Sequence, residues 1–359
     1  MAKSYQNMSD YTVTTNYTSA TQTVSINLLE SGPIFVNLAD QIAFTTFSFV
    51  VFLLVYSMNG IFISTVAFNV QLHTPYFALL IINAIHDLIM SATTFLSVIY
   101  MSLSGTNPYR GNRAMCFVHR MFQMMPFLSK IHSAIFLSLE RLLFFYRPFW
   151  YLRVVTIPRV IVIEVILFTL SSIFSILTTA VGKIYFSPAM LLCSNLTKSW
   201  VWASQMSLYY VPNILVLAST IASLYHLVLK QRRAISSVAV TASTTSATSR
   251  EEQQTAEVDR QTSPANVTES SVRKIRATIK LVAGISGIFW ISIFPALIGM
   301  NIMLSKNLIL EAELASNVKA RLSLRFINFS PIWSWIADPL IYYFVNPQLK
   351  HYFYQMLRK

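Results

Sequence analysis

The chain has 359 residues, of which 54% are hydrophobic and 11% are charged. An ordinary soluble domain carries about 25% charged residues, so this composition excludes a chain that faces mainly water and predicts an integral membrane protein. The formal net charge of +13 does not indicate nucleic acid, because the basic residues flank apolar segments. Anionic membrane lipids and a cytosolic protein partner explain it better.

Seven apolar segments are long enough to cross a bilayer, since a hydrocarbon core of about 30 Å needs roughly 20 helical residues. They cover residues 44–68, 76–100, 117–146, 159–182, 200–229, 278–304 and 322–345. The predicted fold class is therefore an all-α membrane protein, a seven-transmembrane helix bundle over residues 42–345. An odd number of spans places the two termini on opposite sides of the membrane.

Residues 1–41 form a polar tail rich in Ser, Thr and Asn, without the pattern of a cleaved signal peptide. Glycosylation acceptor triplets begin at Asn7 and Asn16 in this tail and at Asn195 between the fourth and fifth spans. Lys and Arg are more numerous in the segments on the opposite side. We therefore expect a multi-pass plasma-membrane protein with a glycosylated extracellular N-terminus. The triplet at Asn266 lies in a proposed inner loop and is interpreted as chance.

The third span places Arg120, Gln123, Met124, Phe127 and Leu128 on one helical face. The facing candidates in the fifth, sixth and seventh spans are Gln205, Tyr209, Leu297, Met300, Arg325 and Asn328. Aromatic and Met side chains with few polar groups suit a small-molecule ligand that is largely apolar. For each residue taken singly, packing in the core is the alternative.

The two cysteines are Cys116, at the outer start of the third span, and Cys193, in the loop before the fifth. Both fall on the oxidising side of the membrane, where a disulfide persists. A bridge would fix that loop over the mouth of the bundle. The alternative is two unrelated buried thiols.

Two further segments lie outside the spans. Residues 234–270 are poor in apolar side chains and predict a flexible third inner loop. Residues 346–359 place Leu349, Phe353 and Met356 at helical spacing among basic positions, which predicts a short amphipathic helix on the inner membrane face; a disordered basic tail is the alternative. The halves show no internal repeat, so a transporter or channel is the weaker interpretation.

Four elements together resemble the rhodopsin-like (class A) G-protein-coupled receptors. Cys116 is followed at the family's spacing by Glu140-Arg141-Leu142, similar to its Asp/Glu-Arg-Tyr triplet, and then by Pro148. The seventh span ends in Asp338-Pro339-Leu-Ile-Tyr342, similar to the family's Asn/Asp-Pro-x-x-Tyr element. The resemblance implies that Glu140 neutralises Arg141 at rest and that activation releases Arg141 toward a heterotrimeric G protein. It also implies that Pro339 lets the helix kink so that Tyr342 swings inward.

The same resemblance implies an ion site at the centre of the bundle. Asp87 matches the family's membrane-buried acid and Asn59 its asparagine partner, although the usual Gly-Asn order is reversed here. Lys130 stands where the family typically has a Ser that helps to hold sodium. Because a buried charge persists when it is paired, we expect Lys130 to form an internal ion cluster with Asp87 and Asp338. The alternative is that Lys130 faces lipid and extends toward the membrane surface.

Other positions depart from known branches of the family. Pro295 keeps the kink of the sixth span, but the Trp that usually precedes it is absent from Ser292-Ile-Phe-Pro295. Gln123 replaces the Asp of amine receptors, and residues 322–345 contain no Lys for a retinal Schiff base.

A narrower resemblance concerns ligand class. Leu72-His73-Thr74-Pro75-Tyr76-Phe77 resembles an element of chordate odorant receptors, which implies a divergent member that detects an odorant. The alternative is a receptor for an endogenous lipid, peptide or transmitter. No catalytic constellation or metal cluster is visible in the sequence, so neither an enzyme nor a cofactor is expected.

Overall fold

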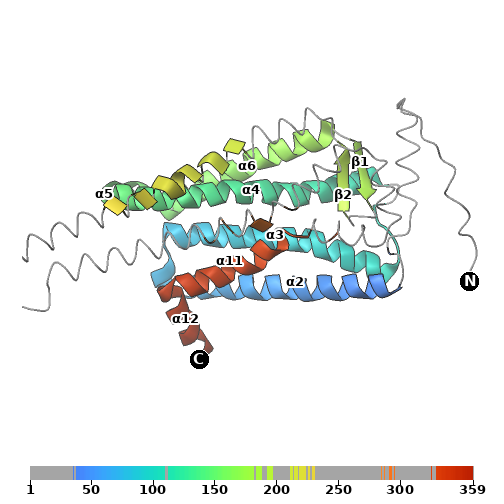
Figure 1. Ribbon diagram of the computed structural model, residues 1–359, viewed down its shortest axis with the longest axis horizontal. Helices are drawn as coiled ribbons and strands as arrows, with labels where there is room; N and C mark the ends of the chain where they lie inside the picture. The colour runs from blue at the N-terminus through green and yellow to red at the C-terminus, as the bar shows by residue number, and fades with distance from the viewer. Residues whose placement is uncertain are drawn as a thin grey trace, which may run out of the picture.

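The computed structural model (Figure 1) describes residues 38–109, 112–181, 183–187, 192–196 and 329–358 as continuous segments, together with Phe35, Arg325 and scattered positions from 211 to 295. Helices make up most of this part of the chain. Their bounds are α2 Leu38–Ala67, η1 Val70–Leu72, α3 Pro75–Ser104, α4 Arg113–Tyr146, α5 Pro148–Val154, α6 Ile157–Val181, α11 Ile332–Val345 and α12 Pro347–Leu357.

Local sequence signals set several of these helix ends. The Thr74 side chain accepts a hydrogen bond from the Phe77 amide, and Pro75 takes the first helical position of α3, where its missing N–H is not needed. Gly105 ends α3 in the left-handed conformation, with φ 63°. Asn346 caps α12 in the same way as Thr74 caps α3, by accepting from the Gln348 and Leu349 amides at 3.0 and 3.3 Å.

The long helices form a bundle in which α2 packs on α3, α3 on α4 and α4 on α6, while α11 contacts both α2 and α3 (Figure 1). Among the described residues, α2, α3 and α6 are long and apolar enough to cross a membrane. The longer α4 carries charged residues along its length. The fold class predicted from the sequence, a helical membrane bundle, is confirmed for these elements.

Helix α6 shows which solvent surrounds the bundle. Its buried positions are Val160, Glu164, Ser171, Ser175 and Thr179, whereas its exposed positions are mostly Ile, Val, Leu and Phe. A helix of a water-soluble protein shows the opposite arrangement, with the apolar stripe facing the core. The exposed apolar face of α6 therefore faces lipid.

A short antiparallel hairpin, β1 Lys183–Ser187 and β2 Leu192–Leu196, lies at one end of the bundle. The sequence predicted only a loop here. Phe186 pairs with Cys193, and Cys193 forms a disulfide with Cys116 in the first turn of α4, with 5.4 Å between the two Cα atoms. The bridge expected from the sequence is therefore present and attaches the hairpin to the bundle. We call this the disulfide end, and the opposite end the α12 end.

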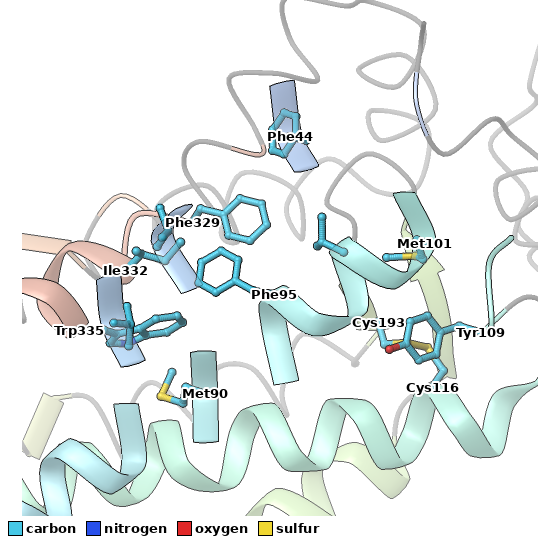
Figure 2. Close-up of a cluster of buried hydrophobic side chains, with 13 residues drawn as sticks. Phe44, Met90, Phe95, Met101, Tyr109, Cys116, Cys193, Phe329, Ile332 and Trp335 are labelled. Atoms are coloured by element: carbon cyan, nitrogen blue, oxygen red, sulfur yellow. A yellow bond between two sulfur atoms is a disulfide. The ribbon is translucent and has the colours of Figure 1, made fainter. Parts of the chain in front are cut away.

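The buried apolar side chains form two clusters. The disulfide-end cluster (Figure 2) contains Phe44, Val51, Val55, Met90, Phe95, Val98, Met101, Tyr109, Cys116, Cys193, Phe329, Ile332 and Trp335. The α12-end cluster contains Phe62, Val66, Leu72, Tyr76, Phe77, Leu79, Leu80, Ala84, Leu137, Val160, Tyr342 and Leu349. Between them, buried polar and charged groups occupy the middle of α3, α4 and α11.

Candidate functional site

A cluster of three buried charges lies where α3, α4 and α11 meet. The Lys130 ammonium of α4 donates a hydrogen bond to Asp87 Oδ1 of α3 at 2.5 Å. The same Nζ lies 2.9 Å from Asp338 Oδ2 of α11. All three side chains are at most 3% exposed. An isolated charge in this position would be strongly destabilising, and the opposite charges compensate one another. Lys130 thus faces the bundle interior and not lipid.

Asn59, which was predicted to belong to this cluster, makes its hydrogen bonds to backbone carbonyls of α2 and α11. Its amide donates to Val55 O at 3.0 Å and to Trp335 O at 3.1 Å, and no hydrogen bond joins it to Asp87 or Asp338 in the described structure. Trp335 is four residues before Pro339, which has no backbone N–H to offer that carbonyl. Asn59 therefore supplies the donor that the helix itself lacks.

A second charged group lies at the α12 end of α4. Arg141 Nε and Nη2 donate to Glu140 Oε2 and Oε1, each at 2.5 Å. Tyr151 of α5, the short helix that begins at Pro148, also donates to Glu140 Oε1. The Arg141 guanidinium carbon lies 3.8 Å from the centre of the Tyr76 ring. Glu140, Arg141, Tyr151 and Tyr76 form what we call the helix-end lock.

The pKa of Tyr151, which lies outside the long helices, is raised because burial disfavours the phenolate and because Glu140 is negative. The hydroxyl therefore remains a proton donor to Glu140. Tyr151 and Tyr76 were not predicted from the sequence to belong to this group. Neither stands in a motif that indicates an interaction with Arg141, and each reaches it from another helix.

Tyr342 of the Asp338-Pro339-Leu-Ile-Tyr342 element is 1% exposed and packs its ring 4.9 Å from that of Phe62. Its hydroxyl has no hydrogen-bond partner among the described residues. The Tyr342 side chain thus points into the bundle and is held by packing. Pro295, the other kink residue predicted, lies in a helical position and is exposed.

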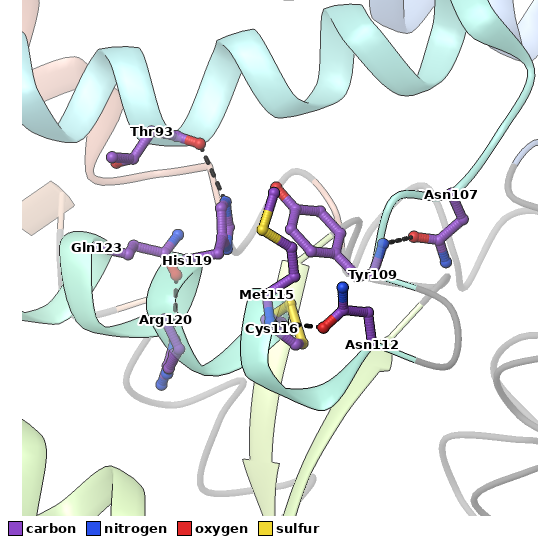
Figure 3. Close-up of a disulfide and its surroundings, with 10 residues drawn as sticks. Thr93, Asn107, Tyr109, Asn112, Met115, Cys116, His119, Arg120 and Gln123 are labelled. Carbon is purple, nitrogen blue, oxygen red and sulfur yellow. Dashed lines mark hydrogen bonds between the residues drawn. A yellow bond between two sulfur atoms is a disulfide. The ribbon is translucent and has the colours of Figure 1, made fainter.

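Two side chains of the predicted ligand face of α4 form a hydrogen bond with each other. Arg120 Nη1 donates to Gln123 Oε1 at 3.2 Å (Figure 3). Gln123 and Leu128 are buried, Met124 is half-buried, and Phe127 packs against the disulfide-end cluster. The structure thus places this face beside the aromatic side chains of α3 and α11.

Arg325, one of the predicted ligand-facing residues, forms an ion pair inside the bundle. It is 0% exposed, and its Nη1 lies 3.0 Å from both carboxylate oxygens of Asp40 in α2. Its guanidinium carbon lies 4.7 Å from the centre of the Phe44 ring. Burial of a guanidinium requires a partner, and Asp40, which the sequence analysis did not single out, provides it.

Glu164 is a further residue that sequence reasoning missed. It is 3% exposed on the inner face of α6 and accepts a hydrogen bond from Ser133 Oγ at 2.6 Å. A carboxyl inside an apolar segment was the available signal.

Several predicted residues lie outside the described part of the chain, namely Gln205, Tyr209, Leu297, Met300, Asn328, Asn7 and Asn16. Asn195 lies in β2, paired with Ile184.

Comparisons with known proteins agree with this architecture. Residues 58–342 match the family described as 7 transmembrane receptor (rhodopsin family). A crystal structure of squid rhodopsin has a TM-score of 0.70 to this chain at 15% sequence identity, and the match covers 90% of this chain and 87% of the rhodopsin chain. At this identity the likeness shows the fold alone. No curated protein matches the chain. The family match covers most of the sequence, and the chain therefore belongs to the rhodopsin family of seven-transmembrane G-protein-coupled receptors, which are not enzymes.

Proposed function

We propose that this receptor detects a small, largely apolar ligand, an odorant, in the half of the bundle next to the disulfide. The observation that carries the proposal is the disulfide-end cluster, in which Phe95 stacks on Phe329 at 6.0 Å and meets Trp335 edge-on at 6.2 Å. Phe127 of the predicted ligand face packs against the same cluster. Aromatic and Met side chains with few polar groups suit such a ligand.

The charges in this region support an uncharged ligand. Lys130 is paired with two carboxylates, and Arg325 is paired with Asp40. An acidic ligand would have to compete with these carboxylates for either cation. The carboxylates are hard to displace, because each pair is close and buried, where charges attract strongly. A ligand amine would find Gln123, which is neutral and accepts from Arg120. Odorant detection is further supported by the resemblance of residues 72–77 to the odorant-receptor element.

We place the disulfide end outside the cell, because a disulfide persists there and because the N-terminal acceptor triplets precede α2. The α12 end then faces the cytosol, together with Arg147, Arg153 and the basic residues of the third inner loop. Helix α12 lies on the inner leaflet, where anionic lipids attract Lys350 and Arg358.

Ligand binding shifts an existing equilibrium between resting and active bundles. The resting state holds Arg141 on Glu140. In the active state Arg141 contacts the heterotrimeric G protein, while Pro295, Pro339 and Tyr342 accommodate the helix movement. Lys130 occupies the place of a sodium ion between Asp87 and Asp338 and makes the bundle independent of that ion.

Screening odorant mixtures on cells that express the receptor, with cyclic-AMP and calcium readouts, tests the ligand class. A response that is lost in Arg141→Ala at equal surface expression supports the proposal. Silence to every mixture in both readouts would contradict odorant detection. A response to an endogenous lipid, peptide or transmitter instead, with expression outside sensory tissue, would favour the alternative ligand class.

A further inference from the structure

The Arg141 guanidinium is bound on its edge and covered on its face. Its edge donates two hydrogen bonds to the Glu140 carboxylate. Its planar face lies over the Tyr76 ring, with 3.8 Å between the guanidinium carbon and the ring centre, whereas the Phe144 ring is 5.3 Å away. A guanidinium is weakly hydrated and stacks well on an aromatic face. The two contacts therefore act on different surfaces of the same group.

The first turn of α3 fixes the position of the Tyr76 ring. Thr74 caps the helix and Pro75 begins it, so the backbone before Tyr76 has little freedom. The ring is 6% exposed, belongs to the α12-end cluster and meets the Phe77 ring at 5.3 Å. Its hydroxyl has no hydrogen-bond partner in the part of the chain that the structure describes. The contribution of Tyr76 to Arg141 thus comes from the ring face.

Three elements converge on this one cation. Tyr76 comes from α3, and Glu140 and Phe144 come from α4 itself. Tyr151 of α5 donates to Glu140 and packs edge-on against Phe144 at 5.2 Å. Glu140, which accepts a hydrogen bond from Tyr151, binds the edge of the guanidinium, whereas the Tyr76 ring attracts the cation at its face. An Arg141 that moves away from the bundle must lose the ring contact together with the carboxylate.

We propose that Tyr76 is a positioning residue that stabilises the resting receptor by holding Arg141 against its ring. This inference rests on the proposed role of Arg141 in G-protein coupling. The interaction exists only while Arg141 is retracted, so it lowers the free energy of the resting state and leaves that of the active state unchanged. Removing it shifts the population toward the active state even without ligand.

The test measures ligand-free nucleotide exchange by purified receptor in lipid nanodiscs, on one heterotrimer from each of the four Gα classes. Tyr76→Leu removes the ring but keeps an apolar side chain, and we expect basal exchange per folded receptor to rise about 5- to 30-fold. Tyr76→Phe keeps the ring and removes only the unpartnered hydroxyl. It should stay within about twofold of the parent receptor.

A series of fluorinated phenylalanines at position 76 separates ring electrostatics from packing. Each fluorine withdraws charge from the ring face and changes the side-chain volume little, so basal exchange should rise with the number of fluorines. This series also decides the matter if Tyr76→Leu folds poorly. A flat series would overturn the proposal, because a ring that acted only by filling space would give that result.

Glu140→Gln distinguishes failure of this inference from failure of the coupling role of Arg141. If Glu140→Gln raises basal exchange while the fluorine series is flat, Arg141 is restrained by its carboxylate alone and only the role of Tyr76 is wrong. If Glu140→Gln also leaves exchange unchanged, the coupling role of Arg141 is wrong, and the role of Tyr76 falls with it.

Discussion

The side-chain amide of Asn59 in α2 donates a hydrogen bond of 3.1 Å to the backbone carbonyl of Trp335 in α11. In a helix this carbonyl would accept from the N–H four residues later, but that residue is Pro339, which has no N–H. Asn59 is fully buried and also donates to Val55 O of its own helix. The bend that Pro339 permits in α11 is thus supported by a side chain of another helix.

Asn59→Ala should lower the stability of the receptor by about 1–3 kcal/mol, because it leaves the Trp335 carbonyl buried without a donor. The measurement is the apparent melting temperature in detergent. In a Pro339→Ala background the helix regains its own N–H, so the same substitution should have a smaller effect. Ser57→Ala is the control, since the Ser57 hydroxyl is exposed and bonds within its own helix. Equal losses in both backgrounds would contradict this explanation.

For the spans that the structure describes, helices lie in the predicted ranges, but their ends differ from those expected. The third helix was expected from residue 117 and begins at Arg113, after the cap at Asn112. The first was expected from residue 44 and begins at Leu38, and Asp40 in its first turn is paired with Arg325 inside the bundle. Hydropathy cannot anticipate such a pair, whose members are 285 residues apart.

The ion cluster was predictable because Asp87, Lys130 and Asp338 are costly in a membrane unless they meet. The neighbours that act through a backbone carbonyl or a ring face, such as Trp335 and Tyr76, carry no such signal in the sequence. An aromatic residue in an apolar helix is ordinary, and only the fold shows which group it faces. The Cys116 to Cys193 disulfide was predictable from the number and the side of the cysteines, whereas the hairpin that it holds was not.

Lys130→Met should destabilise the receptor by about 3–5 kcal/mol, because it leaves Asp87 and Asp338 buried without a cation. Adding Asp87→Asn and Asp338→Asn removes the charges that lost their partner. This triple variant should therefore melt closer to the parent receptor than Lys130→Met does. Melting curves of the variants in one detergent give the comparison, and a triple variant less stable than Lys130→Met would contradict a cluster stabilised by mutual compensation.

Sodium should not affect the parent receptor, because the Lys130 ammonium already lies between the two carboxylates. Melting temperatures in sodium chloride and in N-methyl-D-glucamine chloride at equal ionic strength should coincide. Lys130→Ser opens the space and leaves two acids, so this variant should become more stable in sodium, as expected when a ligand binds the native state alone. A sodium-specific shift in the parent receptor would show that Lys130 does not replace the ion.

Asp40→Asn should destabilise the receptor by about 3–5 kcal/mol, because Arg325 is fully buried and would lose both carboxylate contacts. The double substitution Asp40→Leu with Arg325→Met should recover part of the lost stability, since neither buried charge of this pair then remains. A double-mutant cycle on melting temperatures measures this coupling. Arg113→Gln, at an exposed position of the same end, is the control. Additive effects of the two substitutions would contradict a direct ion pair.

Tyr151→Phe should raise basal nucleotide exchange, because it removes the hydrogen bond that helps Glu140 to retain Arg141. A hydrogen bond to a charged group contributes about 1.5–3 kcal/mol, which sets the upper limit of the shift toward the active state.

The pKa of Tyr151 in the folded receptor is raised by burial and by Glu140. The hydrogen bond from the Tyr151 hydroxyl to Glu140 is therefore fully present below the pKa of the unfolded chain, and it is lost only as pH rises through the pKa of the folded state. The ratio of exchange between Tyr151→Phe and the parent should therefore stay constant between about pH 6 and 9. Tyr146→Phe, at an exposed tyrosine that ends α4, is the control. A ratio that falls to one as pH rises across this range would mean that Tyr151 ionises there and that burial beside Glu140 does not hold its proton.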